Sequence, residues 1–203
     1  MLEKEKYYRL FLIKKINFLF KIILFYLFSI TVAFGDLQND IINKLTATQT
    51  LTFDFKQKIS DREEIGNCVI KYPLLMKCKY KNLKEKMIIA NGKTVAIVKK
   101  KYKKIYLYPI KSTPLFFILK KEKIIDLVRN TKPTKLNSDL IEFIFIDKKK
   151  NEIKILFDKN SLEFKGWKTK DSYSNKVSFE INNLIINNKI LDDFFKIPQE
   201  KDL

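Results

Sequence analysis

Alternation of apolar and polar side chains places the strongest constraint on how this chain can fold. In the stretch LTFDFKQ, Leu51, Phe53 and Phe55 occupy every second position and polar residues lie between them. Successive side chains of a strand point to opposite faces, so this pattern predicts a strand with one buried face. The same two-residue period recurs in seven further segments: 87–90, 95–98, 105–108, 140–146, 152–157, 162–169 and 177–186.

Turn signals separate many of these segments, and the long crossovers that join parallel strands are missing. Asn91-Gly92 is a strong two-residue hairpin signal, while Asp158-Lys159-Asn160 and Asn187-Asn188 are weaker ones. We therefore predict a mainly β (α+β) chain, in which a largely antiparallel sheet of many strands curls around an apolar interior.

Two short helices are expected beside the sheet. Asp36 can cap the first, whose apolar stripe is Leu37, Ile41 and Leu45. In STPLFFIL, Thr113 is a possible N-cap and Pro114 suits the first helical position, so about two apolar turns follow and must be buried. This segment is either a lid over an apolar hollow or an ordinary core helix. Beyond it we expect irregular structure, with one more helical turn near 124–128.

The first 35 residues have the pattern of a secretory signal peptide. A basic region precedes the uncharged run IILFYLFSITVA, whose twelve residues fall short of the ~20 that span a membrane. Ala33 and Gly35 resemble a signal-peptidase site, so we predict cleavage before Asp36 and a single soluble domain over 36–203. The alternative is an uncleaved anchor extended over 16–20, which would place Lys21 inside the apolar span.

The net charge of +18 favours an anionic partner. Candidates are nucleic acid, anionic lipid headgroups and an acidic protein, and export argues against nucleic acid. Lysine, isoleucine, asparagine and phenylalanine are all abundant, as in proteins from AT-rich genomes, and that bias alone can supply the lysines. For the run KKKYKK, Lys99–Lys104, the sequence favours a solvated turn.

Composition also argues against catalytic and metal sites. Without histidine, Ser-His-Asp and Cys-His catalysis and most zinc and iron sites are excluded. The four glycines form no phosphate-binding loop. Asp139, Glu142 and Asp147 could act as glycosidase carboxylates, but they fall at strand ends where solvated charges are usual. We expect a binding protein that needs no cofactor or metal, and not an enzyme.

Cys68 and Cys78 lie in the stretch GNCVIKYPLLMKCKY. A hairpin that turns on the three residues Tyr72–Leu74 makes the two cysteines face each other, within reach of a disulfide in an oxidising compartment. A two-residue turn at Pro73-Leu74 instead places them on opposite faces as two free, apolar residues. Metal binding lacks further ligands, and the spacing is not that of a C-x-x-C redox site.

Taken in order, motifs along the chain resemble the periplasmic outer-membrane lipoprotein carrier proteins, the LolA family. The family's F-x-A-x-F-x-Q strand matches residues 51–57 at Phe55 and Gln57, with Phe53 in the place of alanine. The family's hairpin motif begins with a glycine, contains an Arg-Pro pair and ends near an aromatic residue, and it matches Gly66 through Tyr80. Further matches are Asn91-Gly92, Thr113-Pro114-Leu115-Phe116, the set Leu162, Trp167 and Asp171, and Phe195-Lys196-Ile197-Pro198.

This resemblance implies an incomplete antiparallel β-barrel with short helices as a lid over an apolar cavity. It implies a periplasmic chaperone, expected as a monomer, that takes acylated lipoproteins from an inner-membrane ABC-type releasing complex and delivers them to an outer-membrane acceptor. Three alternatives stay open. A lipoprotein-sensing envelope regulator would normally carry a second domain, the acceptor itself needs a lipidated cysteine, and a small exported enzyme is the third.

Candidate site residues follow from the strand faces and from the resemblance. Those expected to line the acyl-chain cavity are Leu51, Phe53, Phe55, Ile70, Met76, Cys78 and Tyr80. Those expected in the lid helix are Thr113, Pro114, Leu115, Phe116, Ile118 and Leu119. Tyr72 stands where the family has the arginine that ties the lid to the barrel, and tyrosine can donate only one uncharged hydrogen bond. The lid is therefore held more loosely, or Lys71 or Lys77 helps to hold it.

Overall fold

The computed structural model describes residue 21 and residues 37–81, 85–136, 139–146, 150–171 and 174–203. Apart from Lys21, the predicted signal peptide and the proposed helix cap Asp36 lie outside this part of the chain. Within it, no helix has both the length and the apolar character that crossing a membrane requires. Contacts divide the chain into residues 1–40 and residues 41–203, and the second unit holds the sheet.

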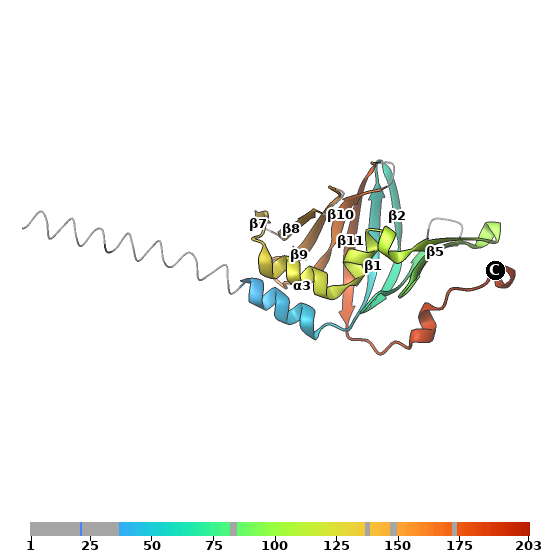
Figure 1. Ribbon diagram of the computed structural model, residues 1–203, viewed down its shortest axis with the longest axis horizontal. Coiled ribbons are helices and arrows are strands. Elements are labelled where there is room, and N and C mark those ends of the chain that lie inside the picture. The colour runs from blue at the N-terminus through green and yellow to red at the C-terminus, as the bar shows by residue number, and fades with distance from the viewer. Residues whose placement is uncertain (1–20, 22–36, 82–84, 137–138, 147–149, 172–173) are drawn as a thin grey trace, which may run out of the picture. The chain divides into compact units, whose positions relative to one another are not determined.

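In the described part of the chain, eleven antiparallel strands form one sheet (Figure 1). Their order is β6-β5-β4-β3-β2-β1-β11-β10-β9-β8-β7, so β6 and β7 are its two edges and the barrel stays open. The predicted mainly β, incomplete antiparallel barrel is confirmed. The strands are β1 (Thr50–Ile59), β2 (Arg62–Lys71), β3 (Leu75–Tyr80), β4 (Lys86–Asn91), β5 (Thr94–Lys99), β6 (Lys104–Pro109), β7 (Lys135–Leu136), β8 (Leu140–Ile146), β9 (Glu152–Asp158), β10 (Phe164–Lys170) and β11 (Lys176–Ile186).

Alternation predicted eight of these strands, β2 and β3 were expected as the hairpin that carries the two cysteines, and β7 was not predicted. One of the eight has a clear boundary error. The predicted strand over 162–169 began too early, because Leu162 lies in the turn after β9 with a φ of 57°. Its N–H donates to Asp158 O at 2.8 Å, and the Asp158 carboxylate accepts from the N–H groups of Asn160 and Ser161. The turn signal at Asp158 thus extends over the two residues that alternation had assigned to the strand.

We call the sheet face that carries Leu51, Ile70, Met76, Ile155 and Phe179 the inner face, and the opposite one the outer face. Cross-strand register places these residues on one side, and all are buried. The pairing of β1 with β11 shifts register between Thr52 and Asp54, where Asn183 has a φ of 51°. This bulge keeps apolar residues of β11 on the inner face up to its end.

Helices α2 (Leu115–Leu119) and α3 (Lys121–Asn130) lie across the inner face, and we call residues 115–130 the lid (Figure 1). Phe117 of α2 stacks on Phe145 of β8 with ring centroids 4.1 Å apart. The expected Thr113 cap is wrong. Its hydroxyl donates to Ile110 O, and Pro114 takes the N-cap position without a side-chain hydrogen bond.

The second helical turn predicted near 124–128 is a full helix of ten residues, α3. Its buried side chains Ile124, Leu127 and Val128 recur at helical spacing and face the sheet, with α3 packed on β8. A separate helix over residues 37–47 buries Ile41 and Leu45. Both helices are therefore held by apolar stripes that the sequence contains.

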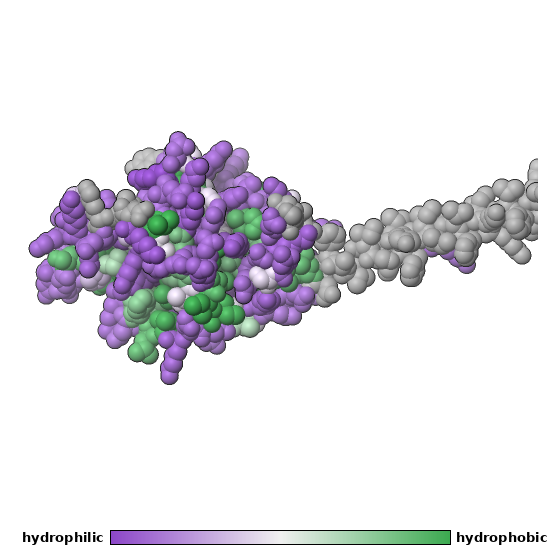
Figure 2. Space-filling model, turned by 180° about the vertical axis from the view of Figure 1, so that it is seen from behind, coloured by the Kyte–Doolittle hydropathy of each residue, from purple (hydrophilic) through white to green (hydrophobic). Residues whose placement is uncertain are grey.

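The C-terminal segment, residues 187–203, runs from the end of β11 to the β6 edge (Figure 1). Short 3-10 turns η3 (Asp192–Phe195) and η4 (Glu200–Asp202) interrupt it, and η3 contacts β3 and β4. Ile197 and Leu203 pack on the buried cluster formed by Ile89, Ala96 and Val98 on the outer face. Elsewhere on the side turned away from α3, hydrophilic side chains predominate around a smaller apolar area (Figure 2).

Candidate functional site

The β2–β3 hairpin turns on three residues, Tyr72, Pro73 and Leu74. With this turn Cys68 and Cys78 are direct cross-strand partners, and a disulfide joins them. Both cysteines are buried on the inner face. The hairpin tip also contacts the lid, because Leu74 N–H donates to Leu119 O at 2.9 Å.

The residues expected to line the cavity are all buried on the inner face. Several of them pack against neighbouring side chains of the same face, and Leu51 also lines a cavity described below. The Phe55 ring meets the Tyr80 ring edge-on at 4.9 Å and stacks on Phe179 at 4.8 Å. Met76 of β3 is buried on the same face, opposite Ile70 of β2. The protein's own side chains thus occupy at least part of the inner face.

The other half of the inner face contributes residues that sequence reasoning left out of the site. Trp167 stacks on Phe179 at 4.0 Å, and Phe143 and Phe157 lie beside them along the sheet. Their strands had been predicted from the same alternation that marked β1. Every second residue of a strand faces inward, so applying that rule to β8–β11 would have identified these residues. Phe117 would have been identified as part of the apolar run of α2.

A lysine ties the lid to the end of the helix over 37–47. Lys121 Nζ donates to Thr46 O at 3.0 Å and to Thr48 O at 2.7 Å. Carbonyls at a helix C-terminus lack partners within the helix and carry partial negative charge, which favours a cation there. Burial lowers the pKa of Lys121, and the neighbouring Glu122 carboxylate partly opposes that shift. No sequence motif pointed to this contact.

Tyr72 meets the lid through its ring and not through its hydroxyl. Lys121 Nζ lies 5.7 Å from the ring centroid, while Tyr72 Oη is buried and finds no hydrogen-bond partner among the described residues. Burial raises the pKa of the Tyr72 phenol strongly, with a further contribution from Glu122. The hydroxyl is therefore a neutral donor held in an apolar place.

Lys71 and Lys77 were considered as substitutes for the family arginine, but both bind the C-terminal segment instead. Lys71 Nζ donates to Ile190 O at 2.8 Å and pairs with Asp192 at 2.6 Å. Lys77 Nζ donates to Phe194 O and lies 4.6 Å from the Phe194 ring centroid. Lys121 and the backbone N–H of Leu74 both make polar contacts between the lid and the rest of the fold.

A cavity of about 120 Å³ opens beside Tyr72. It lies between the helix over 37–47 and the ends of β1, β10 and β11, where Ile186 is half exposed. Ligand pockets for small molecules usually measure about 300–1,000 Å³, so this space is small for a long apolar ligand. The apolar and aromatic side chains that line this cavity include Leu45, Leu51, Tyr72, Phe164, Leu184 and Ile186.

A buried ion pair on the inner face joins Glu64 of β2 to Lys86 of β4. Glu64 is 1% exposed, and its Oε2 accepts a hydrogen bond from Lys86 Nζ at 2.8 Å. Its Oε1 forms an ion pair with Arg62 Nε at 3.1 Å without a hydrogen bond. Tyr80 completes the cluster, because its hydroxyl donates to Gln57 and its ring lies 3.9 Å from Lys86 Nζ. Over the described part of the chain no group of three or more acidic or cysteine side chains could hold a metal ion.

Comparison with protein families gives a decisive match. The model of the outer membrane lipoprotein carrier protein LolA matches residues 46–198, well over half of the chain. The chain belongs to the LolA family. No curated protein matches its sequence.

Solved structures similar to this LolA family member are distant in sequence. An uncharacterised conserved protein from Thermus thermophilus is 7% identical, with a TM-score of 0.49, and the match covers 81% of this chain and 94% of that one. MucB is 7% identical over 83% of this chain and 64% of its own, with a TM-score of 0.46. A LolA superfamily protein from Nitrosomonas europaea is 5% identical over 78% and 97%, with a TM-score of 0.42.

Proposed function

We propose that this protein is a periplasmic carrier that shields the acyl chains of lipoproteins between the two membranes, without enzymatic activity. It receives them from an inner-membrane ABC-type releasing complex and passes them to an outer-membrane acceptor. The observation that carries the proposal is an apolar inner face covered by the lid, which hydrogen bonds of Lys121 and Leu74 join to the rest of the fold. Membership of the LolA family supports the same role.

Physical chemistry sets what such a carrier must do. At about 0.8 kcal/mol for each buried methylene, exposing one 16-carbon chain to water costs on the order of 10 kcal/mol. Release therefore requires direct transfer to an acceptor. An acyl chain of that length needs more space than the cavity of about 120 Å³ beside Tyr72 provides, and aromatic side chains pack together on the inner face. The lid has to move for an acyl chain to enter.

The cavity beside Tyr72 is where entry would begin. It is bordered by apolar residues, it adjoins the half-exposed Ile186, and the Lys121 contact that closes the lid lies next to Tyr72. The unpartnered Tyr72 hydroxyl is available to an ester or amide carbonyl of the ligand, which would remove the cost of burying it alone.

The direct test is co-purification from a periplasm. The exported protein, with its N-terminus established by mass spectrometry, should carry acylated lipoprotein and take up a fluorescent fatty-acyl probe. Recovery of non-acylated partners alone, with no probe uptake, would overturn the carrier proposal and point to the regulator alternative. An N-terminus before Asp36 would separately disprove the predicted cleavage site.

Lys121→Met tests whether the lid competes with the ligand. The change removes two hydrogen bonds of the closed form and keeps the aliphatic stem, so a larger fraction of the protein is open. We expect the apparent affinity for the acyl probe to rise about tenfold. The expected change is no larger because water weakens the two hydrogen bonds, which are partly exposed. Fluorescence titration measures it.

Lys123→Met is the matched control, because Lys123 lies on the same helix and its Nζ lies 5.9 Å from the centroid of the Phe116 ring, within the lid itself. Its affinity should stay near that of the wild type. Equal affinities for wild type and Lys121→Met would show that the Lys121 contact does not gate uptake.

A further inference from the structure

The connection between β5 and β6 concentrates positive charge around an exposed aromatic ring. Five of the six residues Lys99–Lys104 are lysines, and the sixth, Tyr102, is 56% exposed. The short turn η1 (Lys100–Tyr102) and Lys103 make the bend. Figure 1 shows this tip at the end of the sheet far from α3. We call residues 99–108 the basic hairpin.

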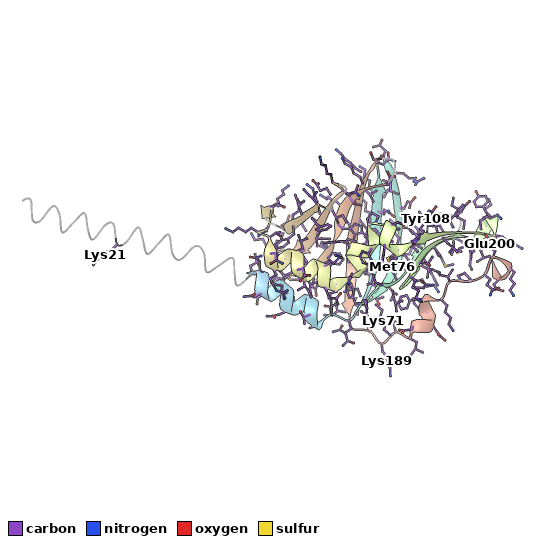
Figure 3. All side chains as sticks on the ribbon, in the orientation of Figure 1. Lys21, Lys71, Met76, Tyr108, Lys189 and Glu200 are labelled. Carbon is purple, nitrogen blue, oxygen red and sulfur yellow. A yellow bond between two sulfur atoms is a disulfide. The ribbon has the colours of Figure 1, made fainter. Side chains whose placement is uncertain are left out.

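Apolar side chains continue from the tip along the edge strand β6. Tyr106 and Tyr108 on the inner face are 45% and 44% exposed, and Leu107 on the outer face is 60% exposed (Figure 3 labels Tyr108). An edge strand with apolar residues on both faces is unusual for a protein surface that meets only water. The solvated lysine turn predicted from the sequence does not account for these residues.

Among the described residues, one lysine of the basic hairpin, Lys104, forms an ion pair. Glu200 pairs with Lys104 at 3.9 Å and accepts from Ile105 N–H at 2.9 Å (Figure 3). Lys77 and Lys79 on β3 add to the positive charge. Burial lowers the pKa of Lys77, and the charges of Lys79 and Lys100 lower it further.

We propose that the basic hairpin docks on the surface of an anionic phospholipid membrane. Lysines attract acidic headgroups, and tyrosine rings prefer the boundary between headgroups and acyl chains, so the two residue types fit the same partner. Lysines beside exposed aromatic rings also suit nucleic acid, but the predicted export argues against that partner. An edge strand of a second protein fits the apolar side chains and leaves the lysines without a role. The inference goes beyond the carrier proposal, because it holds whatever the inner face binds.

The test is binding of the exported protein to vesicles of phosphatidylcholine mixed with phosphatidylglycerol, measured by co-sedimentation. Each lysine near an anionic surface strengthens binding about fivefold, so replacing Lys100, Lys101 and Lys103 with glutamine should weaken it on the order of a hundredfold. Lys99 and Lys104 are left in place because they contact Tyr106 and Glu200. Tyr102→Ser should weaken binding as well, at unchanged charge.

The matched control replaces Lys58, Lys168 and Lys170 with glutamine. These three exposed lysines lie on β1 and β10, so the net charge falls equally away from the hairpin. Binding by this variant should stay within a few-fold of the wild type. Binding should also fall as salt rises from about 0.1 M to 1 M, where the screening length shrinks from about 10 Å to 3 Å.

Three outcomes would overturn the proposal. One is equal weakening by the hairpin and control variants, which would indicate non-specific charge attraction. Another is equal binding to vesicles of phosphatidylcholine alone. The third is a hairpin variant that binds vesicles normally but changes the oligomeric state in solution, which would assign the surface to a second copy of the chain. Far-UV circular dichroism checks that every variant stays folded.

Discussion

Lys86→Met is expected to lower the free energy of unfolding by about 3 kcal/mol. Lys86 is the hydrogen-bonding partner of Glu64, which is 1% exposed, and the two charges lie 2.8 Å apart. Removing the lysine leaves a carboxylate inside an apolar region with only the more exposed Arg62 beside it. Desolvation of an unpaired charge is the cost that the ion pair now offsets. Denaturant titration of the wild type and the variant measures the difference.

Two comparisons isolate this effect. Lys56→Met removes a lysine that lies at a similar distance, 2.9 Å, from Glu63, the neighbour of Glu64 on β2, but both side chains of this pair are about half exposed. It should change stability little, because water screens that pair. The double variant Glu64→Gln/Lys86→Met should recover much of the lost stability, since it removes both charges together. Equal effects of Lys56→Met and Lys86→Met would show that Glu64 is not desolvated in the folded protein.

Local patterns predicted the fold because apolar and polar residues alternate along most strands of the sheet. Each strand from β1 to β11 that alternates strongly was located to within a few residues, and the three-residue turn at Tyr72–Leu74 set the register of the β2–β3 hairpin. These features depend on neighbours in the chain. The exceptions, such as the turn at Leu162, arise where a polar side chain binds backbone N–H groups and ends the strand pattern.

Contacts between distant segments could not be predicted in the same way. Lys121 reaches carbonyls more than seventy residues away, and Lys71 and Lys77 reach the C-terminal segment at separations above one hundred. A lysine has no pattern that reveals its partner, because a long flexible side chain can bind any nearby acceptor. The polar contacts of Lys121, Lys71 and Lys77 therefore had to be taken from the structure, whereas the apolar inner face could be inferred from the sequence.

Replacing Cys68 and Cys78 with alanine is expected to lower the free energy of unfolding by about 3 kcal/mol. Their disulfide closes a loop with a sequence separation of 10, and a cross-link of that span restricts the unfolded chain by about this amount. The loop contains the Tyr72–Leu74 turn, whose Leu74 N–H holds the lid at Leu119 O. A looser turn weakens that contact too, so the variant should also bind the acyl probe more readily than the wild type does.

Reductant provides the internal control for this prediction. Reduced wild type should unfold at nearly the same denaturant concentration as the double alanine variant, and reductant should leave the variant unchanged. If the two cysteines remained free thiols in the exported protein, reductant would not alter the wild type, and the variant would lose only the small cost of two truncated side chains. That result would contradict the disulfide and leave the β2–β3 register to its backbone hydrogen bonds and its apolar face alone.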